Sequence, residues 1–370
     1  MRKEGKVEFD IRHSKLDNVA VSRILNIGVS VPPHEISQLS LRDLARGHFQ
    51  TGIGEIGRLI SVFDNVQVKH RHFCVPVEWF GEPHTFEERN DLYNRWAEDL
   101  GSQAIQNCLE PLGVDPSRVD HLLFVSTSGM STPSVDARLI NRLGFDRHVC
   151  RTPIFGLGCA GGAAGLSRCH QLSKADPQAL VLLVAVEISS LTFQADDFSK
   201  SNLVAAALFA DGAAAVLVGG NGTDLPGPEI MDTQSTLWPD TLDVMGWDFS
   251  SRGLSVIFSK SIPFLLRKFV RENVDGFLTR SSQTVASMSH FAIHPGGARI
   301  LESMSESLQI SEDHLALSRR VLEEYGNMSS PTVLFILKRL LENGGPSAGD
   351  HGLAAAFGPG FSSELLLLKW

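Results

Sequence analysis

Cysteine is scarce in this chain. Only five of the 370 residues are cysteine, at positions 74, 108, 150, 159 and 169, and no two form a C-x-x-C pair. An odd number without paired spacing argues against a disulfide framework and predicts a reducing, cytoplasmic compartment. The sequence also lacks an H-E-x-x-H motif and a phosphate-binding Walker loop. We therefore predict no metal site and interpret the cysteines as free thiols.

Positive charge and long apolar runs are also lacking. The formal net charge is −9, which argues against a nucleic-acid partner. The longest useful apolar run, Ala179 to Val186, is far shorter than the ~20 residues of a membrane helix, so we predict no stable membrane insertion. Residues 1–22 are charged and without an apolar core. They resemble an N-terminal extension and not a signal peptide.

Short apolar runs that alternate with helical patterns indicate an α/β fold. Runs this apolar predict strands that are covered on both faces. The clearest predicted strands are 121–127, 179–187, 213–218, 290–293, 352–357 and 364–369. The Gly- and Pro-rich stretch 219–229 predicts a connection between two halves, residues 23–219 and 220–370.

The order of elements occurs twice along the chain. Cys159 follows Ser128 by 31 residues, and Asn327 follows His294 by 33 residues. In each half a strand, a helical pattern, a loop with its helix and two further strands follow one another. This duplication predicts that Cys159, His294 and Asn327 meet near a pseudo-twofold axis.

The stretch FGLGCAGGAAG, residues 155–165, allows two interpretations. Gly156, Gly158 and Gly161 match the spacing of a dinucleotide-binding loop, and Glu187 supplies a plausible acid further on. The preceding CRTPIF is a poor central strand, because Arg151 and Pro153 interrupt it. The alternative is that the glycines let a buried helix begin at a nucleophilic Cys159.

Cysteine, histidine and asparagine together form a known chemical set. A base forms the thiolate and an amide holds a developing oxyanion. Taken singly, Cys159 is also explained as a small core residue, His294 as a turn residue before Pro295, and Asn327 as a turn or helix cap. Their joint placement favours the catalytic interpretation, in which a protonated His294 holds Cys159 as a thiolate.

Five motifs then identify a family resemblance. GLGCAGGAAGL, ALFADGAAAVLV, AIHPGGARIL, YGNMSSPTVLFIL and FGPGFSSELLLLKW resemble the type III polyketide synthases of the thiolase superfamily, in family order. The resemblance implies a five-layered αβαβα thiolase-like fold and a homodimer. It implies that Cys159 accepts the acyl group beside His294 and Asn327, and that coenzyme A thioesters are substrates with no further cofactor.

The resemblance also implies roles for other residues. Phe209 matches the aromatic gatekeeper between the coenzyme A tunnel and the cavity. The positions that match the cavity lining are Thr127, Thr132, Thr192, Trp247, Val256 and Ser329, with Thr132 reaching into the partner subunit. Val256 stands where plant members have a second aromatic gate, and Trp247 where they have a small residue.

Coenzyme A contacts are less well preserved. Of three basic residues on one helix in plant members, only Arg58 remains, so Arg299, Lys69 or Arg71 are candidates for the phosphates. Lys69 and Arg71 are equally explained as solvated surface charges.

HTFEERNDLY and GWDF look most like the bacterial branch that makes alkylpyrones or alkylresorcinols from fatty acyl starters. We therefore expect condensation of a medium- to long-chain acyl-CoA with several malonyl-CoA, followed by cyclisation. A single-condensation ketoacyl-ACP synthase of the same fold is one alternative. An NAD-dependent oxidoreductase and a non-catalytic acyl-binding module are weaker ones.

Overall fold

The computed structural model describes residues 21–50, 60–223, 225–342 and 345–370. The predicted extension, residues 1–22, lies almost wholly outside the described residues. The strands are β1 (Ser22–Ser30), β2 (His34–Ser37), β3 (His70–Phe73), β4 (His121–Val125), β5 (Cys150–Ile154), β6 (Leu180–Ile188), β7 (Asp211–Gly219), β8 (Glu229–Leu237), β9 (Met245–Ser250), β10 (Gly253–Phe258), β11 (His290–Ile293), β12 (His351–Gly358) and β13 (Ser362–Lys369).

The helices lie between these strands. They are α1 (Gln38–Gln50), α3 (Val62–Asn65), α4 (Phe86–Leu109), α5 (Val135–Leu143), α6 (Gly161–Ala175), α7 (Lys200–Leu208), α8 (Ile262–Thr279), α9 (Ala298–Leu308), α10 (Ala316–Tyr325) and α11 (Thr332–Glu342). Each of the six predicted strands is present, with ends that differ from the prediction by no more than a few residues.

A nine-stranded sheet organises the molecule, in the order β11-β12-β13-β8-β1-β7-β6-β4-β5. Its two halves meet where β1 and β8 pair through only two residue pairs. β4 is parallel to β6 and β11 is parallel to β12, whereas β6–β7 and β12–β13 are antiparallel. The strand order of one half is therefore repeated in the other, which confirms the predicted duplication.

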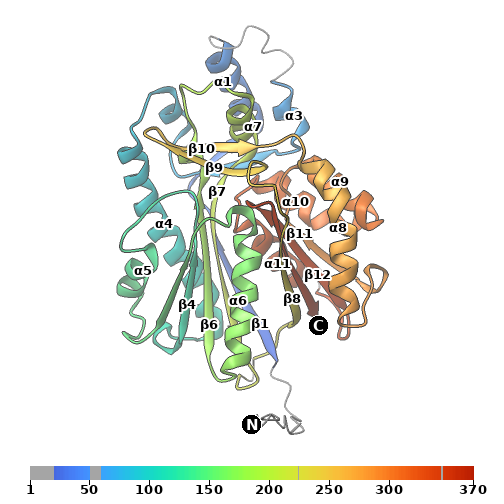
Figure 1. The fold of residues 1–370 in the computed structure, drawn as a ribbon. Helices are drawn as coiled ribbons and strands as arrows, with labels where there is room; N and C mark the ends of the chain where they lie inside the picture. Colours follow the sequence, from blue (N-terminus) through green and yellow to red (C-terminus); the bar gives the residue numbers. More distant parts are fainter. Residues whose placement is uncertain (1–20, 51–59, 224, 343–344) are drawn as a thin grey trace, which may run out of the picture.

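The helices complete five layers (Figure 1). α4 and α5 cover the outer face of the first half-sheet, and α8 and α9 cover the outer face of the second. α6 and α11 contact each other and strands of both halves, so they form the central layer. The start of α6, residues 161–166, is buried on every side, which explains why it is small and apolar all round.

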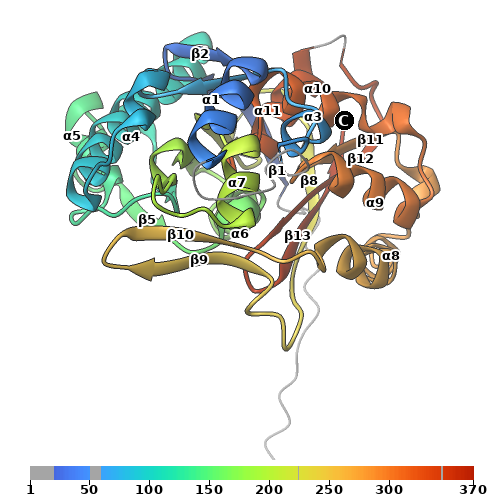
Figure 2. The ribbon, with the colours of Figure 1, turned by 90° about the horizontal axis from the view of Figure 1, so that it is seen from above.

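A smaller unit caps the carboxyl ends of the parallel strands (Figures 1 and 2). α1, α3 and α7 share one apolar cluster with β3. The β9–β10 hairpin lies across the same end of the molecule, as both views show. Ligands in open α/β sheets bind beyond the carboxyl ends of the strands, so this cap roofs the candidate site.

CRTPIF does form a strand, β5, but at the edge of the sheet. Most of β5 is exposed, and Arg151 pairs with the buried carboxylate of Asp136, 2.6 Å away. Because β5 has a neighbour on one side only, Pro153 costs no hydrogen bond to a second strand. The residues that disfavoured a central strand are thus compatible with an edge strand.

Candidate active site

Cys159 lies in a 3₁₀ turn, Gly158–Ala160, that runs directly into α6. Gly158 has a φ of +48°, in the left-handed region that favours glycine, and its N–H donates to Thr127 Oγ1 at 3.2 Å. A Cβ on Gly162 would lie 2.2 Å from the backbone oxygen of Ser330, at the start of α11. The glycines therefore serve the turn and close helix packing, as the nucleophile interpretation predicts.

The second half of the chain supplies His294 and Asn327. His294 follows β11 and stays in register through its N–H, which donates to Ala355 O at 2.8 Å. Asn327 follows α10 and is tied to the chain around Phe209: its N–H donates to Leu208 O, and its carbonyl accepts from Ala210 N–H. The segment before β7 in the first half thus fixes the backbone of Asn327.

Cys159, His294 and Asn327 line one small cavity of about 30 Å³. All three are buried, and Cys159 Sγ lies 3.9 Å from Asn327 Oδ1. That same Oδ1 accepts the N–H of Ser329 at 2.7 Å, so the amide Nδ2 faces away from this contact. Within the described residues, Asn327 Nδ2 and both ring nitrogens of His294 have no hydrogen-bond partner. Unpaired polar atoms this deeply buried are expected where a ligand will complete them.

Burial sets the protonation of the pair. It raises the pKa of the Cys159 thiol to about 11, although the Ser329 hydroxyl opposes the shift. Burial lowers the pKa of His294 to about 3. Both directions favour a neutral thiol beside a neutral imidazole, contrary to the expected thiolate and imidazolium. The physical reason is that no described charged group lies close enough to compensate for the removal of water.

Glu187 is a buried carboxylate behind this site that the sequence interpretation assigned only to a dinucleotide loop. Its Oε2 accepts the N–H groups of Thr127 and Ser128, and its Oε1 accepts the Ser330 hydroxyl at 2.9 Å. Burial raises the pKa of Glu187 to about 7, despite these hydrogen bonds. Glu187 therefore joins the loop after β4 to the start of α11.

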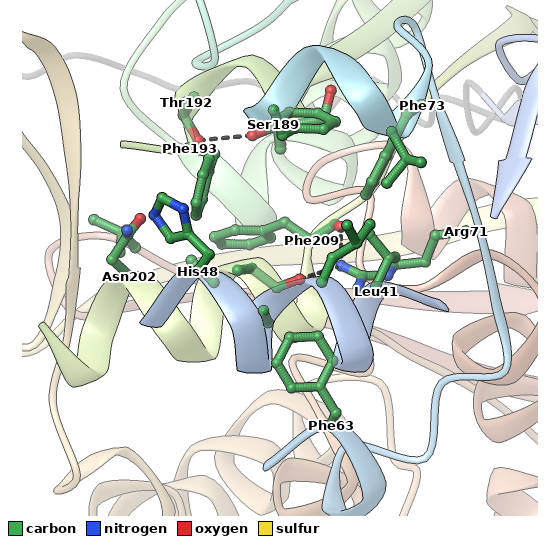
Figure 3. Close-up of a pocket in the computed structure, with 18 of the residues that line it drawn as sticks. Leu41, His48, Phe63, Arg71, Phe73, Ser189, Thr192, Phe193, Asn202 and Phe209 are labelled. Carbon is green, nitrogen blue, oxygen red and sulfur yellow. Dashed lines mark hydrogen bonds between the residues drawn. The ribbon is translucent and has the colours of Figure 1, made fainter. Parts of the chain in front are cut away.

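Phe209 lines a second cavity of about 120 Å³ (Figure 3). Its walls are mainly apolar and come from the cap: Leu41 and Phe49 of α1, Phe63 of α3 and Phe73 of β3 contribute. Thr192, Phe209, Trp247 and Val256, all predicted from the resemblance, line this cavity together. Three of the predicted lining positions are therefore gathered around the predicted gatekeeper.

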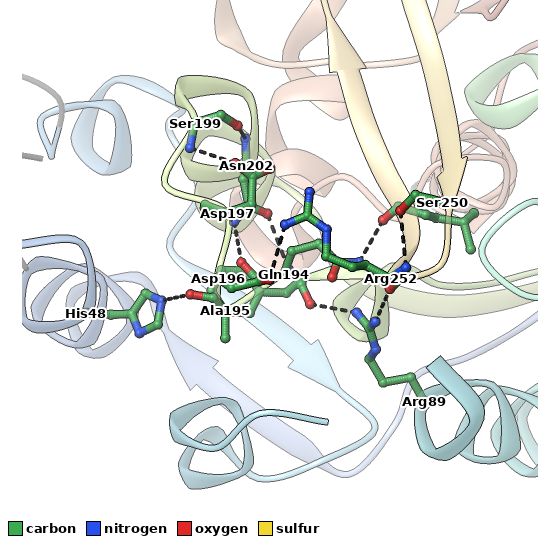
Figure 4. A network of polar contacts seen from close by, with 12 residues as sticks. His48, Arg89, Gln194, Ala195, Asp196, Asp197, Ser199, Asn202, Ser250 and Arg252 are labelled. Carbon is green, nitrogen blue, oxygen red and sulfur yellow. Dashed lines mark hydrogen bonds and ion pairs between the residues drawn. The ribbon is translucent and has the colours of Figure 1, made fainter. Parts of the chain in front are cut away.

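One wall of this apolar cavity is held by a polar network (Figure 4). The loop after Thr192 is fixed by Arg89, which donates to Phe193 O at 3.0 Å and also to Arg252 O. Gln194 donates to Arg252 O and Leu254 O, and so ties the same loop to the β9–β10 hairpin. The hairpin carries Trp247 and Val256, so this network ties the loop after Thr192 to the strands that carry two other lining residues.

The other predicted residues are distributed around the two cavities. Thr127 and Ser329 are buried beside the Cys159 loop and line neither cavity. Thr132 is exposed, so it does not line the cavity of its own chain. Arg299 is exposed in the first turn of α9, next to Ile300, which lines the Cys159 cavity. Arg58 lies outside the described residues.

Arg71 corrects the expectation of either a phosphate contact or a surface charge. It is fully buried, and its guanidinium donates to the carbonyls of Ala206 and Phe209 at 2.7 and 2.8 Å and to Gln38 Oε1. Burial lowers the pKa of Arg71 to about 9. Arg71 therefore supports the backbone of Phe209, the predicted gatekeeper, just after α7. Lys69 is largely exposed and pairs with Glu323 at 3.1 Å.

The comparisons with known proteins agree with this geometry. The N-terminal domain of chalcone and stilbene synthases matches residues 12–222, and the C-terminal domain of the same enzymes matches residues 229–370. The chain belongs to the chalcone and stilbene synthase family. This assignment confirms the resemblance and excludes the oxidoreductase alternative.

Individual members of the family are similar over almost their whole length. A putative chalcone synthase of Bacillus subtilis (strain 168) is 42% identical over 358 residues, which cover 94% of this chain and 98% of the relative. The 1,3,6,8-tetrahydroxynaphthalene synthase of Streptomyces peucetius subsp. caesius is 33% identical, with coverage of 97% and 95%.

The solved structures give the same result. The crystal structure of 1,3,6,8-tetrahydroxynaphthalene synthase from Streptomyces coelicolor A3(2), described as a bacterial type III polyketide synthase, superimposes with a TM-score of 0.88 at 32% identity. It covers 94% of this chain and 99% of that chain. The thiolase-like fold and the class of enzyme are thereby confirmed: this is a type III polyketide synthase, an acyltransferase that condenses malonyl units from coenzyme A thioesters. The family needs no cofactor beyond these substrates.

Proposed function

We propose that this synthase loads a medium- to long-chain fatty acyl group onto Cys159, extends it with several malonyl-CoA and cyclises it to an alkylpyrone or alkylresorcinol. The single observation that supports a fatty acyl starter is the apolar cavity lined by Phe209, whose walls present leucine, alanine and phenylalanine side chains to a ligand. An alkyl tail gains ~0.8 kcal/mol for each methylene buried there. The roles of individual residues below belong to the same proposal.

Loading begins from the neutral pair. As Cys159 Sγ attacks the thioester carbonyl of acyl-CoA, its proton passes to His294, and the coenzyme A thiolate leaves with that proton. The product is an acyl-Cys159 thioester. The ring nitrogens of His294 have no hydrogen-bond partner among the described residues, so one of them can accept the thiol proton. Because burial lowers the pKa of His294, the ring returns that proton readily to the departing thiolate.

Chain extension uses the side chains of Asn327 and His294 as hydrogen-bond donors. Malonyl-CoA loses CO₂, and the electron pair of the broken C–C bond forms an enolate whose oxygen accepts hydrogen bonds from Asn327 Nδ2 and His294. The enolate carbon then attacks the acyl thioester and expels Cys159 as a thiolate, so the chain grows by two carbons. Loss of one such donor typically raises the barrier by ~3–4 kcal/mol.

The deciding experiment is incubation of the purified chain with malonyl-CoA and a ladder of acyl-CoA starters, followed by product mass. We expect products that contain an intact fatty acyl chain and several malonyl units, and none from Cys159→Ala. Products built from malonyl units alone would contradict the proposal that a fatty acyl group is the starter. One condensation per starter, with preference for ACP-bound malonyl, would support the ketoacyl-ACP synthase.

For coenzyme A, we propose that Arg299 contacts the phosphates. It is exposed in the first turn of an 11-residue helix, where the dipole also favours anions, and the adjoining Ile300 faces the Cys159 cavity. Arg299→Ala should raise KM for malonyl-CoA but not for a malonyl thioester that lacks phosphates. An equal rise for both thioesters would refute this contact.

We also propose a homodimer. Thr132 is exposed, and it lies two residues after the exposed side chain of Met130, while Phe155 and Phe249 form another exposed apolar pair with rings 6.3 Å apart. A second copy would cover these side chains and bring Thr132 to its cavity. Light scattering that gives the mass of a monomer at micromolar concentration would contradict the dimer.

A further inference from the structure

The ring of Phe209 contacts two other aromatic rings. The ring centroid of Trp247 lies 5.9 Å away, and that of Phe258 lies 5.6 Å away in a stacked arrangement with planes 28° apart. Both neighbours belong to the β9–β10 hairpin, where Val256 pairs with Trp247 and Phe258 pairs with Met245. Alternate residues of a strand share a face, so Val256 and Phe258 point the same way.

These residues divide the two cavities between them. Phe258 and Met245 line the small cavity of Cys159, whereas Trp247 and Val256 line the apolar cavity, as does Phe209. The Cys159 cavity, at about 30 Å³, has room for one or two water molecules only. An acyl chain bound to Cys159 needs more room than this cavity offers, and the stacked rings join the lining of the one cavity to the lining of the other.

We propose that Phe258 is the second half of the gate and determines which acyl chains pass from Cys159 into the apolar cavity. This inference rests on the proposed function. Val256 stands where plant members have a second aromatic gate, and its side chain is too small to serve as one. The aromatic ring stands two residues later on the same strand face and stacks on Phe209 from the side of Cys159.

The stack is suited to open and close. An aromatic pair contributes about as much free energy as the burial of one or two methylenes, so an incoming alkyl tail can displace it. When the rings close again, they shield the Cys159 cavity from water that would hydrolyse the thioester. Phe258 is only partly buried, so its ring has a path along which to move.

The experiment compares Phe258→Ala and Phe258→Leu with a matched control, Ile257→Ala. Ile257 is the adjoining residue on the opposite face of β10 and lines neither cavity. For each variant, kcat/KM is measured with malonyl-CoA and straight-chain acyl-CoAs of increasing length. In Phe258→Ala we expect the preferred starter to become longer. Beyond the wild-type optimum, kcat/KM should rise about fourfold per methylene, which corresponds to ~0.8 kcal/mol. Ile257→Ala should keep the wild-type profile.

A double-mutant comparison tests whether the two rings act as one gate. If they do, Phe209→Leu and Phe258→Leu shift the chain-length profile by similar amounts, and the double variant adds little. Thermal unfolding identifies any variant that fails to fold, and the conservative leucine variants then decide the matter.

The gate proposal is contradicted if Phe258→Ala lowers kcat/KM equally for all starters, or if Ile257→Ala shifts the chain-length profile as much as Phe258→Ala does. It is also contradicted if the shifts caused by Phe209→Leu and Phe258→Leu add up in the double variant. Failure of the proposed function is distinguishable, because the wild-type chain would then take no fatty starter. In that case the gate is tested by the number of malonyl units per product, which Phe258→Ala should increase and Ile257→Ala should not.

Discussion

The two halves of this synthase share a scaffold and use it differently. In the first half Val125 of β4 pairs with Ala185 of β6, and in the second Ile293 of β11 pairs with Ala355 of β12. One residue after Val125 is Ser126, and one after Ile293 is His294. The register therefore makes Ser126 the counterpart of His294.

The same register makes Glu187 the counterpart of Phe357. Glu187 lies two residues after Ala185 and accepts three hydrogen bonds from the surrounding loops. Phe357 lies two residues after Ala355 and lines the Cys159 cavity. Equivalent places thus carry a structural carboxylate in one half and a cavity wall in the other. A duplicated fold fixes where groups can meet, and the individual side chains decide what happens there.

The largest effect is expected where the counterparts differ in chemistry. His294→Ala should slow malonyl-CoA decarboxylation by about 10²–10³, the usual effect of removing one oxyanion donor. Ser126→Ala should leave the rate close to wild type and cost ~1–3 kcal/mol of stability, because the buried Tyr93 hydroxyl, 2.8 Å from Ser126 Oγ, loses its acceptor. The release of CO₂ and urea unfolding measure the two effects. A similar loss of rate in both variants would contradict the asymmetry.

The second test concerns Glu187. Glu187→Ala should lower the free energy of unfolding by about 3 kcal/mol or more, since each orphaned donor costs ~1–3 kcal/mol. Phe357→Leu, at the counterpart position, should cost less than about 1.5 kcal/mol. Urea unfolding at one pH compares the two variants, and equal losses would show that the carboxylate has no special structural role.

Glu187→Gln adds a pH dependence. The pKa of Glu187 is raised from 4.5 to about 7 in the folded state, so between these values the folded chain keeps a proton that the unfolded chain has lost. Wild-type stability from this group therefore falls as the pH rises through that window, by about 3 kcal/mol in total. Glutamine mimics the protonated acid and should gain stability relative to wild type between pH 4.5 and 8. A difference in Tm that stays constant with pH would contradict the shift.

The smallest effects concern the two central helices. Gly162 of α6 packs against Val333 and Leu334 of α11. A Cβ added to Gly162 would clash with the backbone oxygen of Ser330. Gly162→Ala should therefore cost ~1–3 kcal/mol through overpacking. The matched variant Gly47→Ala lies in α1 of the cap, where nothing is within 4 Å of the added Cβ, and should stabilise the chain by ~0.5–1 kcal/mol. Chemical denaturation of both variants measures the contrast, and two stabilising results would show that α6 and α11 can separate without cost.

Several features were predictable because they are local. Apolar runs such as those of β6 and β12 gave the strands, and the loop glycines marked a buried helix at Cys159. Arg71 was not predictable, because its immediate neighbours are polar and two of its acceptors, the carbonyls of Ala206 and Phe209, lie more than a hundred residues away. Phe258 was missed although Val256 was considered. The alternation of side chains along a strand would have pointed to it.

No helix in the described part of the chain is long and apolar enough to cross a membrane. The sequence by itself determined the α/β class, the duplicated order of elements and the three residues that meet in the Cys159 cavity. Only the tertiary structure revealed that burial raises the pKa of Cys159 and lowers the pKa of His294. It also revealed that Glu187 and Arg71 form buried hydrogen bonds, and that the ring of Phe258 stacks on that of Phe209. The reason is physical: periodicity and spacing are properties of neighbouring residues, whereas burial, protonation and ring contacts depend on segments that only the fold brings together.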